Sequence, residues 1–545
     1  MISAEFSESQ IKILERFVTN TTSNVFVLRN LPEVIKGALF SRYSRSTLGL
    51  RALLLKEFIL NEDTAFGSIA GKLLESDSGQ EQMVAVQKAQ SFYDRILDGY
   101  GDDSIGELGG AHLAIESISM LGAKIIEDSR IGGSPLEKST RYIYFDQKVE
   151  GNYLFYQEPV LMTSAFRNLY VDTCNVLFDT YNQLIPSLTA QIEQSFPKDP
   201  SISKGAYTAA LRAKVLDCLR GLLPASALTN MGVFGNGRFY EGLLQKLNCH
   251  NLAEMQDIGR KSLTELNKVI PSFIRRADPE HRHQQSFSQF MESMQETLER
   301  FSQEHAREIE SFSEACGVRL IDADPKGISK VAGALLFSHA HGSLEKLQAY
   351  CASLPEEKIG ALFDAVTAGR QNRRHKSPRA LEHAGFTFEL LADFGAYRDL
   401  QRHRILTQER QRLTCHYGYY MPPELAGTEM EKEYRKAMEL AKTAYDQIAP
   451  TLPEEAQYVV PMAYNIHWYI HTNLRALQWM CEIRSQAAGH STYRRIAQEM
   501  AAQVCERFPL LQKFFQFVDY EGYELGRLNA EMRKEEKLNL LPRNG

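Results

Sequence analysis

Three adjacent residues, Arg402, His403 and Arg404, are the first place in this sequence where chemistry is expected. Two guanidinium groups with an imidazole between them offer a compact set of hydrogen-bond donors, which suits phosphates or the electron-rich edge of a flavin ring. Glu382 and His383 precede them by about twenty residues. Short motifs also match by chance, so a solvated charged face is the alternative interpretation.

Related spacings occur in the two halves of the chain, which suggests an internal duplication. The pattern Pro-x11-Asn-x-Arg occurs at Pro224, Asn236 and Arg238 and again at Pro461, Asn473 and Arg475. An offset of 273 aligns residues 104–142 with 377–415, although only six of these 39 positions are identical. The Pro-x11-Asn-x-Arg patterns are instead related by an offset of 237. Because the offset falls from 273 to 237 between these two matching segments, the first half carries about 36 extra residues, between about 143 and 223.

The elements that must position these residues are expected to be mostly helices. Apolar residues recur three and four positions apart in 81–97, 166–185 and 430–448, as in amphipathic helices. The segments 141–145 and 385–390 are rich in aromatic and β-branched residues and predict strands. We therefore expect an α+β fold that is predominantly helical, with small sheets. The polar stretch 278–310 predicts a connecting helix.

Composition narrows the class of protein. The chain has 545 residues, 62 Lys and Arg against 68 Asp and Glu, and a formal net charge of -6, which gives no general reason to bind nucleic acid polymers or anionic membranes. The eight cysteines form no C-x-x-C pair, and the histidines lack metal-ligand spacing, so neither a disulfide framework nor a metal site is expected. No leader or membrane-spanning segment is expected either, which predicts a cytoplasmic protein.

The two half-motifs resemble the signature of the flavin-dependent thymidylate synthases, R-H-R-x-x-S-x-N-E-x-S-x-R-Y. The second half keeps the front of this signature, in Arg402 to Arg404 and Thr407, and loses the back. The first half loses the front and keeps the back, in Ser134, Glu137, Ser139, Arg141 and Tyr142. The resemblance implies two tandem synthase-like domains, 1–277 and 326–545, each with a small sheet flanked by long helices and joined by a helical connector at 278–325.

The resemblance also implies an activity: methylation of dUMP to dTMP, with FAD as cofactor and with methylenetetrahydrofolate and NADPH as co-substrates. Each family role is carried over to matching positions of this sequence. Arg484 would polarise the pyrimidine as the catalytic residue, because charge develops there when C5 becomes nucleophilic. The residues implied to bind the flavin are Arg402, His403, Arg404, Asn473, Arg475, His490, Glu382, Ser377, His375 and Ser338. Those implied to bind the nucleotide are Glu137, Ser139, Arg141 and Arg220.

The complementary losses imply a composite site, with the flavin held mainly by residues 330–545 and the nucleotide phosphate mainly by 100–240. A homodimer of such chains would imitate the family's homotetramer. Single residues retain structural alternatives: a helix-surface pair or a tertiary salt bridge for Asn473 and Arg475, polar packing for each histidine, and a pair with Glu482 or another local carboxylate for Arg484. Two other functions also remain open, namely a flavin- and folate-dependent enzyme acting on another pyrimidine nucleotide, and a non-catalytic nucleotide-binding paralogue.

Overall fold

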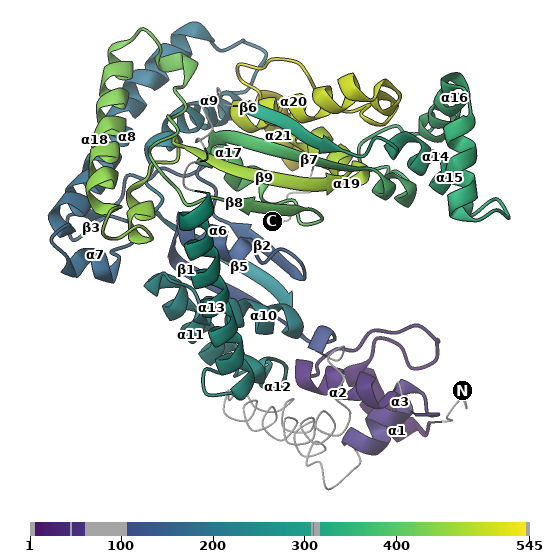
Figure 1. Cartoon of the computed structure of the whole chain (residues 1–545). Coiled ribbons are helices and arrows are strands. Elements are labelled where there is room, and N and C mark those ends of the chain that lie inside the picture. Colours follow the sequence, from purple (N-terminus) through teal and green to yellow (C-terminus); the bar gives the residue numbers. More distant parts are fainter. Residues whose placement is uncertain (1–5, 44–45, 60–105, 307–308, 310–316, 541–545) are drawn as a thin grey trace. The chain divides into compact units, whose positions relative to one another are not determined.

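The structure, a computed structural model, describes residues 6–43, 46–59, 106–306, 309 and 317–540. The chain forms two compact units: one of residues 1–116, 125–137 and 230–310, the other of 117–124, 138–229 and 311–545. Figure 1 labels their elements. The tandem boundaries after residues 277 and 325 remain predictions.

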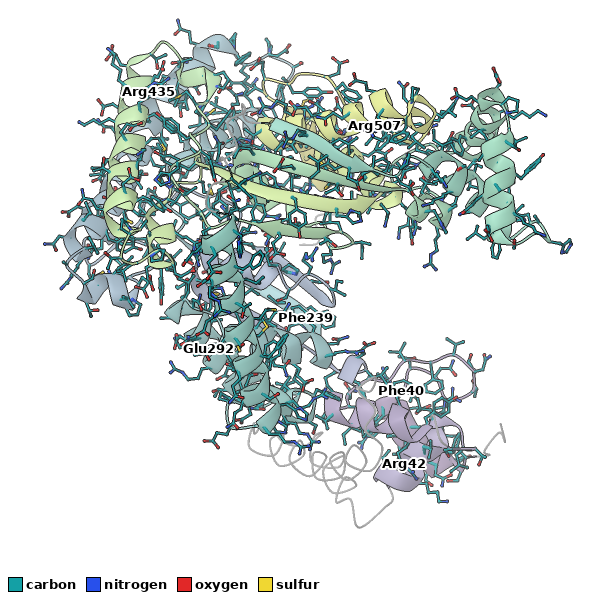
Figure 2. The ribbon with its side chains drawn as sticks, viewed as in Figure 1. Phe40, Arg42, Phe239, Glu292, Arg435 and Arg507 are labelled. Carbon is teal, nitrogen blue, oxygen red and sulfur yellow. The ribbon has the colours of Figure 1, made fainter. Side chains whose placement is uncertain are left out.

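The first unit contains a three-stranded sheet whose strand order is β1-β5-β2. Its elements, some of which extend into the second unit, are α1 (Glu8–Phe17), α2 (Glu33–Tyr43), α3 (Leu50–Leu53), η1 (Leu54–Ile59), β1 (Gly110–Ser119), α6 (Met120–Glu127), β2 (Gly133–Glu137), β5 (Leu228–Asn236), α10 (Gly237–Asn248), α11 (Ala253–Leu266), α12 (Pro271–Ile274), η5 (Arg275–Ala277) and α13 (Arg282–His305). The ring of Phe239, labelled in Figure 2, lies against Gly133 and Gly235, where a Cβ atom would collide with it. These glycines therefore let α10 approach the sheet.

Apart from the parts of β1, α6 and β5 that extend into it, the second unit contains the segment that follows Tyr142 and the chain from β6 to α21. Its first elements are β3 (Lys148–Val149), β4 (Asn152–Tyr153), α7 (Pro159–Thr163), α8 (Arg167–Ser195), α9 (Lys204–Leu219) and η4 (Arg220–Leu222). The later ones are β6 (Gly317–Ala323), α14 (Gly327–Phe337), α15 (Leu344–Ser353), α16 (Glu356–Thr367), η6 (Arg379–His383), β7 (Gly385–Asp393), α17 (Phe394–Leu400), β8 (Thr407–Arg410), η7 (Pro423–Leu425), α18 (Glu429–Ile448), η8 (Glu455–Val459), β9 (Asn465–Asn473), α19 (Leu474–Arg484), α20 (Ser491–Arg507), η9 (Pro509–Phe514) and α21 (Leu528–Leu540).

A four-stranded antiparallel sheet of order β6-β7-β9-β8 forms the centre of the second unit. Helix α20 packs against β6 and β7, and α8 lies beside α18 (Figure 1). Phe388, Leu390 and Ile470 of the central strands are fully buried. Because these strands are covered, the strand ends hold the following helix starts in fixed positions.

The two halves share one strand-and-helix plan. In each, a strand leads into a short helix (β1 to α6, β7 to α17), and a later strand leads into a longer one (β5 to α10, β9 to α19). The order β1-β5-β2 matches β7-β9-β8. Equivalent caps occur too: Asn236 accepts a hydrogen bond from the N–H of Phe239, and Asn473 from that of Ala476, both at 2.9 Å. The structure thus confirms the duplication that the sequence suggested.

The two repeats meet within the second unit at their equivalent prolines, Pro224 and Pro461, which form an antiparallel bridge. The N–H of Ala225 donates to the carbonyl of Val460 at 2.8 Å, and the N–H of Met462 donates to the carbonyl of Leu223 at 2.9 Å. By the offset of 237, Ala225 is equivalent to Met462 and Leu223 to Val460, so the two hydrogen bonds are equivalent to each other. The junction therefore has a local twofold pseudosymmetry.

Most of the predicted elements are confirmed, but the prediction of a strand at 141–145 is wrong. The helices expected at 166–185 and 430–448 are α8 and α18, the strand at 385–390 lies in β7, and the connecting helix is α13. The helix expected at 81–97 lies outside the described residues.

Residues 141–145 form a turn and irregular chain instead of a strand. The N–H of Tyr142 turns back to the carbonyl of Ser139, and the Arg141 side chain is held by Asp217. Tertiary contacts thus override the β propensity of this segment.

Candidate active site

A basic pocket in the second unit gathers residues from both halves of the sequence. Its cavity volume is about 290 Å³, close to the lower end of the range for small-molecule sites. Its charged lining consists of Lys138, Arg141, Arg220, Arg373, Arg398, Asp399, Arg402, Arg484 and Arg527. Seven arginines and one lysine against one carboxylate create a strongly positive environment. Such a lining suits a ligand with several negative charges.

Arg141 enters the pocket wall from the first half and is held by a two-pronged ion pair. Its Nε and Nη2 donate to the two carboxylate oxygens of Asp217 on α9, both at 2.5 Å. Its Nη1 donates to the carbonyl of Ala488, in the second half, at 3.1 Å. Burial lowers the pKa of Arg141 and raises that of Asp217, but their mutual attraction outweighs burial in both cases. Arg141 is therefore charged and rigidly placed.

Arg220, at the start of η4, has an unsatisfied donor. Its Nη1 lies 3.5 Å from Oδ2 of Asp399, while its buried Nη2 has no hydrogen-bond partner. The residue is only 5% exposed, so water from bulk solvent does not readily satisfy this group. A buried donor without an acceptor costs about 1–3 kcal/mol, which makes Nη2 a candidate contact for an anionic ligand.

Asp399, on the last turn of α17, is the carboxylate that balances this lining. Its Oδ1 lies 3.9 Å from Nη2 of Arg402. Burial raises the pKa of Asp399, but the charges of Arg402, Arg220 and Arg484 lower it well below its usual range. Asp399 is thus ionised and orders the surrounding guanidinium groups.

Arg484, the last residue of α19, is oriented by His403. Its Nε donates to Nε2 of His403 at 2.9 Å, so His403 accepts with Nε2 and carries its proton on Nδ1. Burial, with the nearby charge of Arg484, lowers the pKa of His403 well below 6.5. Glu482 pairs with Arg370 and does not neutralise Arg484. The alternative of a local ion pair between Arg484 and Glu482 is therefore excluded.

Three of the expected flavin-binding residues form a separate cluster. Arg475 donates from Nε to the carbonyl of Ser377 at 2.9 Å and from Nη1 to Glu382 at 2.7 Å. Asn473, two residues earlier, caps α19 with its side chain. The structure therefore brings Ser377, Glu382 and Arg475 together, and it uses Asn473 locally.

His490 is buried beside the pocket and uses both ring nitrogens within the protein. Nδ1 accepts from the N–H of Thr492 at 3.2 Å, and Nε2 lies 3.1 Å from the carbonyl of Asp217. Burial, with the charge of Arg220, lowers its pKa to about 3. His490 therefore supports the segment that holds Arg141.

Other expected residues lie away from the lining of this pocket. Arg404 and His375 are exposed, and Ser338 is an exposed residue at the end of α14. The carbonyl of His375 accepts from Nε of Arg370 at 2.9 Å. Glu137 lies in the first unit at the end of β2, opposite Met231. Ser139 does line the pocket, and its hydroxyl accepts from the N–H of Arg141 at 3.3 Å.

Several lining residues were not expected from the sequence. Arg398 lies one helical turn before Arg402, a spacing that could have indicated it. Arg373, Tyr493 and Arg527 carry no motif in the sequence that points to the site. Tyr493 contributes its ring, whose centroid lies 5.8 Å from the guanidinium carbon of Arg484.

The described part of the chain contains neither a metal-binding cluster nor a membrane-spanning helix. Among those residues, no group of three or more His, Cys, Asp or Glu side chains could hold a metal ion. In the same ranges, no helix combines the length and apolar character needed to cross a membrane.

Family comparison identifies the class of protein. A family model described as "thymidylate synthase complementing protein" matches residues 62–272 and again residues 319–510. The chain belongs to this family. The double match agrees with the repeated fold and with the two half-motifs.

Two relatives match this chain over nearly their whole length, and a third matches over a shorter stretch. A UPF0159 protein of Chlamydia pneumoniae is 56% identical over 97% of this chain and 98% of its own length. A UPF0159 protein of Thermoplasma acidophilum is 33% identical over 92% of this chain and 99% of its own. A flavin-dependent thymidylate synthase of Clostridium tetani is 28% identical, covering 36% of this chain and 85% of itself.

One similar solved structure is a UMP/dUMP methylase from Streptomyces cacaoi bound with 5-Br dUMP. It is 18% identical, has a TM-score of 0.31, and covers 38% of this chain and 96% of its own.

Proposed function

We propose that the chain is a FAD-dependent thymidylate synthase, which methylates dUMP to dTMP with methylenetetrahydrofolate and NADPH as co-substrates. The observation that carries the proposal is one basic pocket that combines Arg141 and Arg220 of the first half with Arg402 and Arg484 of the second. Family membership and the complementary half-motifs support the same conclusion.

The nucleotide phosphate is assigned to the first-half side of the pocket. Arg220 offers its unpartnered Nη2, and Ser139 and Arg141 form the adjoining wall. Two donors of the Arg141 guanidinium already bind Asp217. Arg141 therefore acts on the phosphate mainly through its charge and by fixing the position of the pocket wall. Glu137 stays a proposed nucleotide contact by resemblance alone.

The flavin is assigned to the second-half side, where Arg402 and His403 lie. FAD supplies the electron transfer that the family chemistry requires, and the protein supplies binding and orientation. The anionic phosphates of FAD suit the positively charged lining of this pocket. Ser377, Glu382 and Arg475 form a second proposed contact cluster, and His375, Arg404 and Ser338 are further proposed contacts. Asn473 and His490 are proposed to act by holding the elements that carry these groups.

Arg484 is proposed as the catalytic residue. A guanidinium group against the pyrimidine carbonyls stabilises negative charge on the ring when C5 becomes nucleophilic. His403 fixes the orientation of Arg484 and, being neutral, adds no competing positive charge. Orientation by a neutral partner adds no counter-charge to that of Asp399, which already acts on Arg484.

The test is a flavin titration. Purified protein is loaded with FAD, freed of excess, and observed by visible absorption while dUMP is added; we expect retained flavin and a saturable spectral shift. Turnover with methylenetetrahydrofolate and NADPH follows. A folded protein that retains no flavin would contradict the proposal.

Variants test the composite nature of the site. Arg402→Ala should weaken flavin retention, and Arg220→Gln should raise the Kd of dUMP about 10- to 100-fold, the range for a lost charged hydrogen bond. Arg435→Ala is the matched control, since Arg435 is an exposed arginine on α18 (Figure 2). Unchanged flavin and nucleotide binding in both Arg141→Ala and Arg402→Ala would rule out a composite site.

Another pyrimidine nucleotide is the second candidate substrate. The observation that favours it is Asp399, which lines the pocket and, like Arg410 and Arg412, departs from the family pattern around the motif. Retained flavin with no response to dUMP, but a response to another pyrimidine monophosphate, would select this alternative. Nucleotide binding without flavin would instead select a non-catalytic paralogue.

A further inference from the structure

The segment after α20 reaches back to the pocket, although the family match ends at residue 510. Three hydrogen bonds fasten its backbone to the body of the second unit. The carbonyl of Asp519 accepts from Nε2 of Gln498 at 2.7 Å, and the carbonyl of Glu521 accepts from Nη2 of Arg494 at 2.8 Å. The N–H of Asp519 donates to the hydroxyl of Ser485 at 2.9 Å.

The chain then passes directly against the pocket rim. A Cβ atom at Gly526 would collide with the carbonyl oxygen of Ala487, so only glycine allows this approach. Ala488 and Gly489, which follow, line the pocket. Helix α21 is attached further along, where Glu535 accepts a hydrogen bond from the Ser203 hydroxyl. Arg527 is therefore delivered to the pocket by an ordered connection.

The Arg527 side chain combines a fixed position with a buried donor that has no acceptor. Its guanidinium carbon lies 4.3 Å from the centroid of the Tyr142 ring, which holds the flat group by a cation–π contact. Its Nε is buried and has no hydrogen-bond partner. Burial, with the neighbouring charge of Arg141, lowers its pKa to about 10. An anion in the pocket would satisfy the donor and offset the repulsion.

We propose that Arg527 binds the phosphate of the nucleotide, as an addition to the site made by a segment beyond the family match. The assignment to the nucleotide rests on the function proposed above and on the neighbours of Arg527, which are Arg141 and Tyr142 of the first-half motif. Arg527 thus makes the C-terminal segment part of the substrate site.

The experiment compares Arg527→Ala with Arg533→Ala in the full-length, FAD-loaded protein. Arg533 is an exposed arginine on α21, the helix that begins directly after Arg527, and it does not line the pocket, so its removal controls for charge and for helix α21. Binding of dUMP, deoxyuridine and inorganic phosphate is measured for each protein. We expect Arg527→Ala to raise the Kd of dUMP about 10- to 100-fold, leave deoxyuridine binding unchanged, and bind flavin normally. Arg527→Lys should recover part of the loss.

The outcomes separate this inference from the proposed function. Equal dUMP affinity in the Arg527→Ala and Arg533→Ala proteins overturns the inference, as does a loss confined to flavin binding. If the wild type binds no dUMP, the proposed function fails, and inorganic phosphate then tests the anion site alone. If phosphate protects the wild type against thermal unfolding and Arg527→Ala abolishes this protection, Arg527 forms an anion site. If phosphate gives no protection, the inference is overturned. Arg527→Gln replaces the alanine variant if thermal unfolding shows that alanine loosens α21.

Discussion

At the scale of single residues, the pocket contrasts satisfied and unsatisfied charges. Arg141 and Asp217 satisfy each other's charges through two hydrogen bonds. Such a buried pair mainly fixes the positions of its two side chains, because desolvation offsets much of the attraction between them. Arg220 and Arg527 each keep a buried donor without an acceptor. The first kind of arginine shapes the wall, and the second kind is available to a ligand. Neutral His403 and His490 orient their neighbours without adding charge.

A pH dependence follows from these two histidines. Burial lowers the pKa of His403 well below 6.5 and that of His490 to about 3, so the unfolded chain binds more protons than the folded one in mildly acidic solution. Their contribution to stability is full above pH 6.5 and falls as the pH drops toward their folded pKa values. At pH 5.5 each should cost about 1.4 kcal/mol relative to pH 8.

Urea unfolding between pH 8 and pH 5.5 measures this effect. His490→Asn retains a side chain that can cap α20 and should remove about half of the pH dependence. An identical pH dependence in wild type and variant would show that His490 is not responsible.

At the scale of elements, the site is built from strand and helix ends. Asp393 ends β7 and caps α17, Arg484 ends α19, and Arg220 starts η4 after α9. The first-half region 143–223, within which the extra residues lie, contains α9 with Asp217 and then Arg220 at the start of η4. Side chains at such ends are precise because buried neighbouring strands and helices hold the backbone.

Gly395 provides a test at this scale. Alanine in place of helical glycine normally stabilises by about 1 kcal/mol. Here a Cβ would lie 2.9 Å from the capping oxygen of Asp393 and 3.2 Å from Nη2 of Arg220. Gly395→Ala should therefore lower the Tm and weaken dUMP binding, whereas Gly242→Ala, at an open position on α10, should raise the Tm. Thermal unfolding and dUMP titration measure both; a Gly395→Ala protein that behaves like Gly242→Ala would contradict the proposed packing.

At the scale of the whole molecule, duplication has produced unequal halves. The positions equivalent to Arg220 and Arg484 by the offset of 237 are Gln457 and Leu247. Gln457 accepts a hydrogen bond from the N–H of Leu413 at 3.1 Å, a structural use of its side chain. A tandem chain can lose one copy of a shared site while the other copy is kept by selection. Each chain is thus proposed to hold one complete site.

Stoichiometry tests this proposal. Saturated protein should bind one FAD per 61.9 kDa chain, measured by flavin absorbance against protein concentration. Sedimentation should give a homodimer, the assembly proposed to imitate the family's tetramer. Two flavins per chain would mean that both halves keep a functional site, and a monomer would remove the tetramer analogy.

The sequence was sufficient for the repeat, the α+β class and most of the long helices. The apolar periodicity that predicts a helix is a local property of the sequence, and it predicted α8 and α18. The spacing from Pro224 to Arg238 recurs in the second half because one strand and the start of one helix occupy it in both halves. The same local argument failed at residues 141–145, where a strand was expected from β propensity. There a long-range ion pair, to which propensity is blind, decides the conformation.

The sequence by itself therefore determined the family, the duplication and the residues of the two half-motifs. Only the tertiary structure decided which of those residues share a pocket: it joined Arg141, Arg220, Arg402 and Arg484, left Arg404 and Ser338 outside the lining, and added Arg373 and Arg527. The physical reason is that a pocket is closed by contacts between residues far apart in the chain. Chain folding brings Arg527 to Tyr142 across nearly four hundred residues, and no spacing within a motif records that approach.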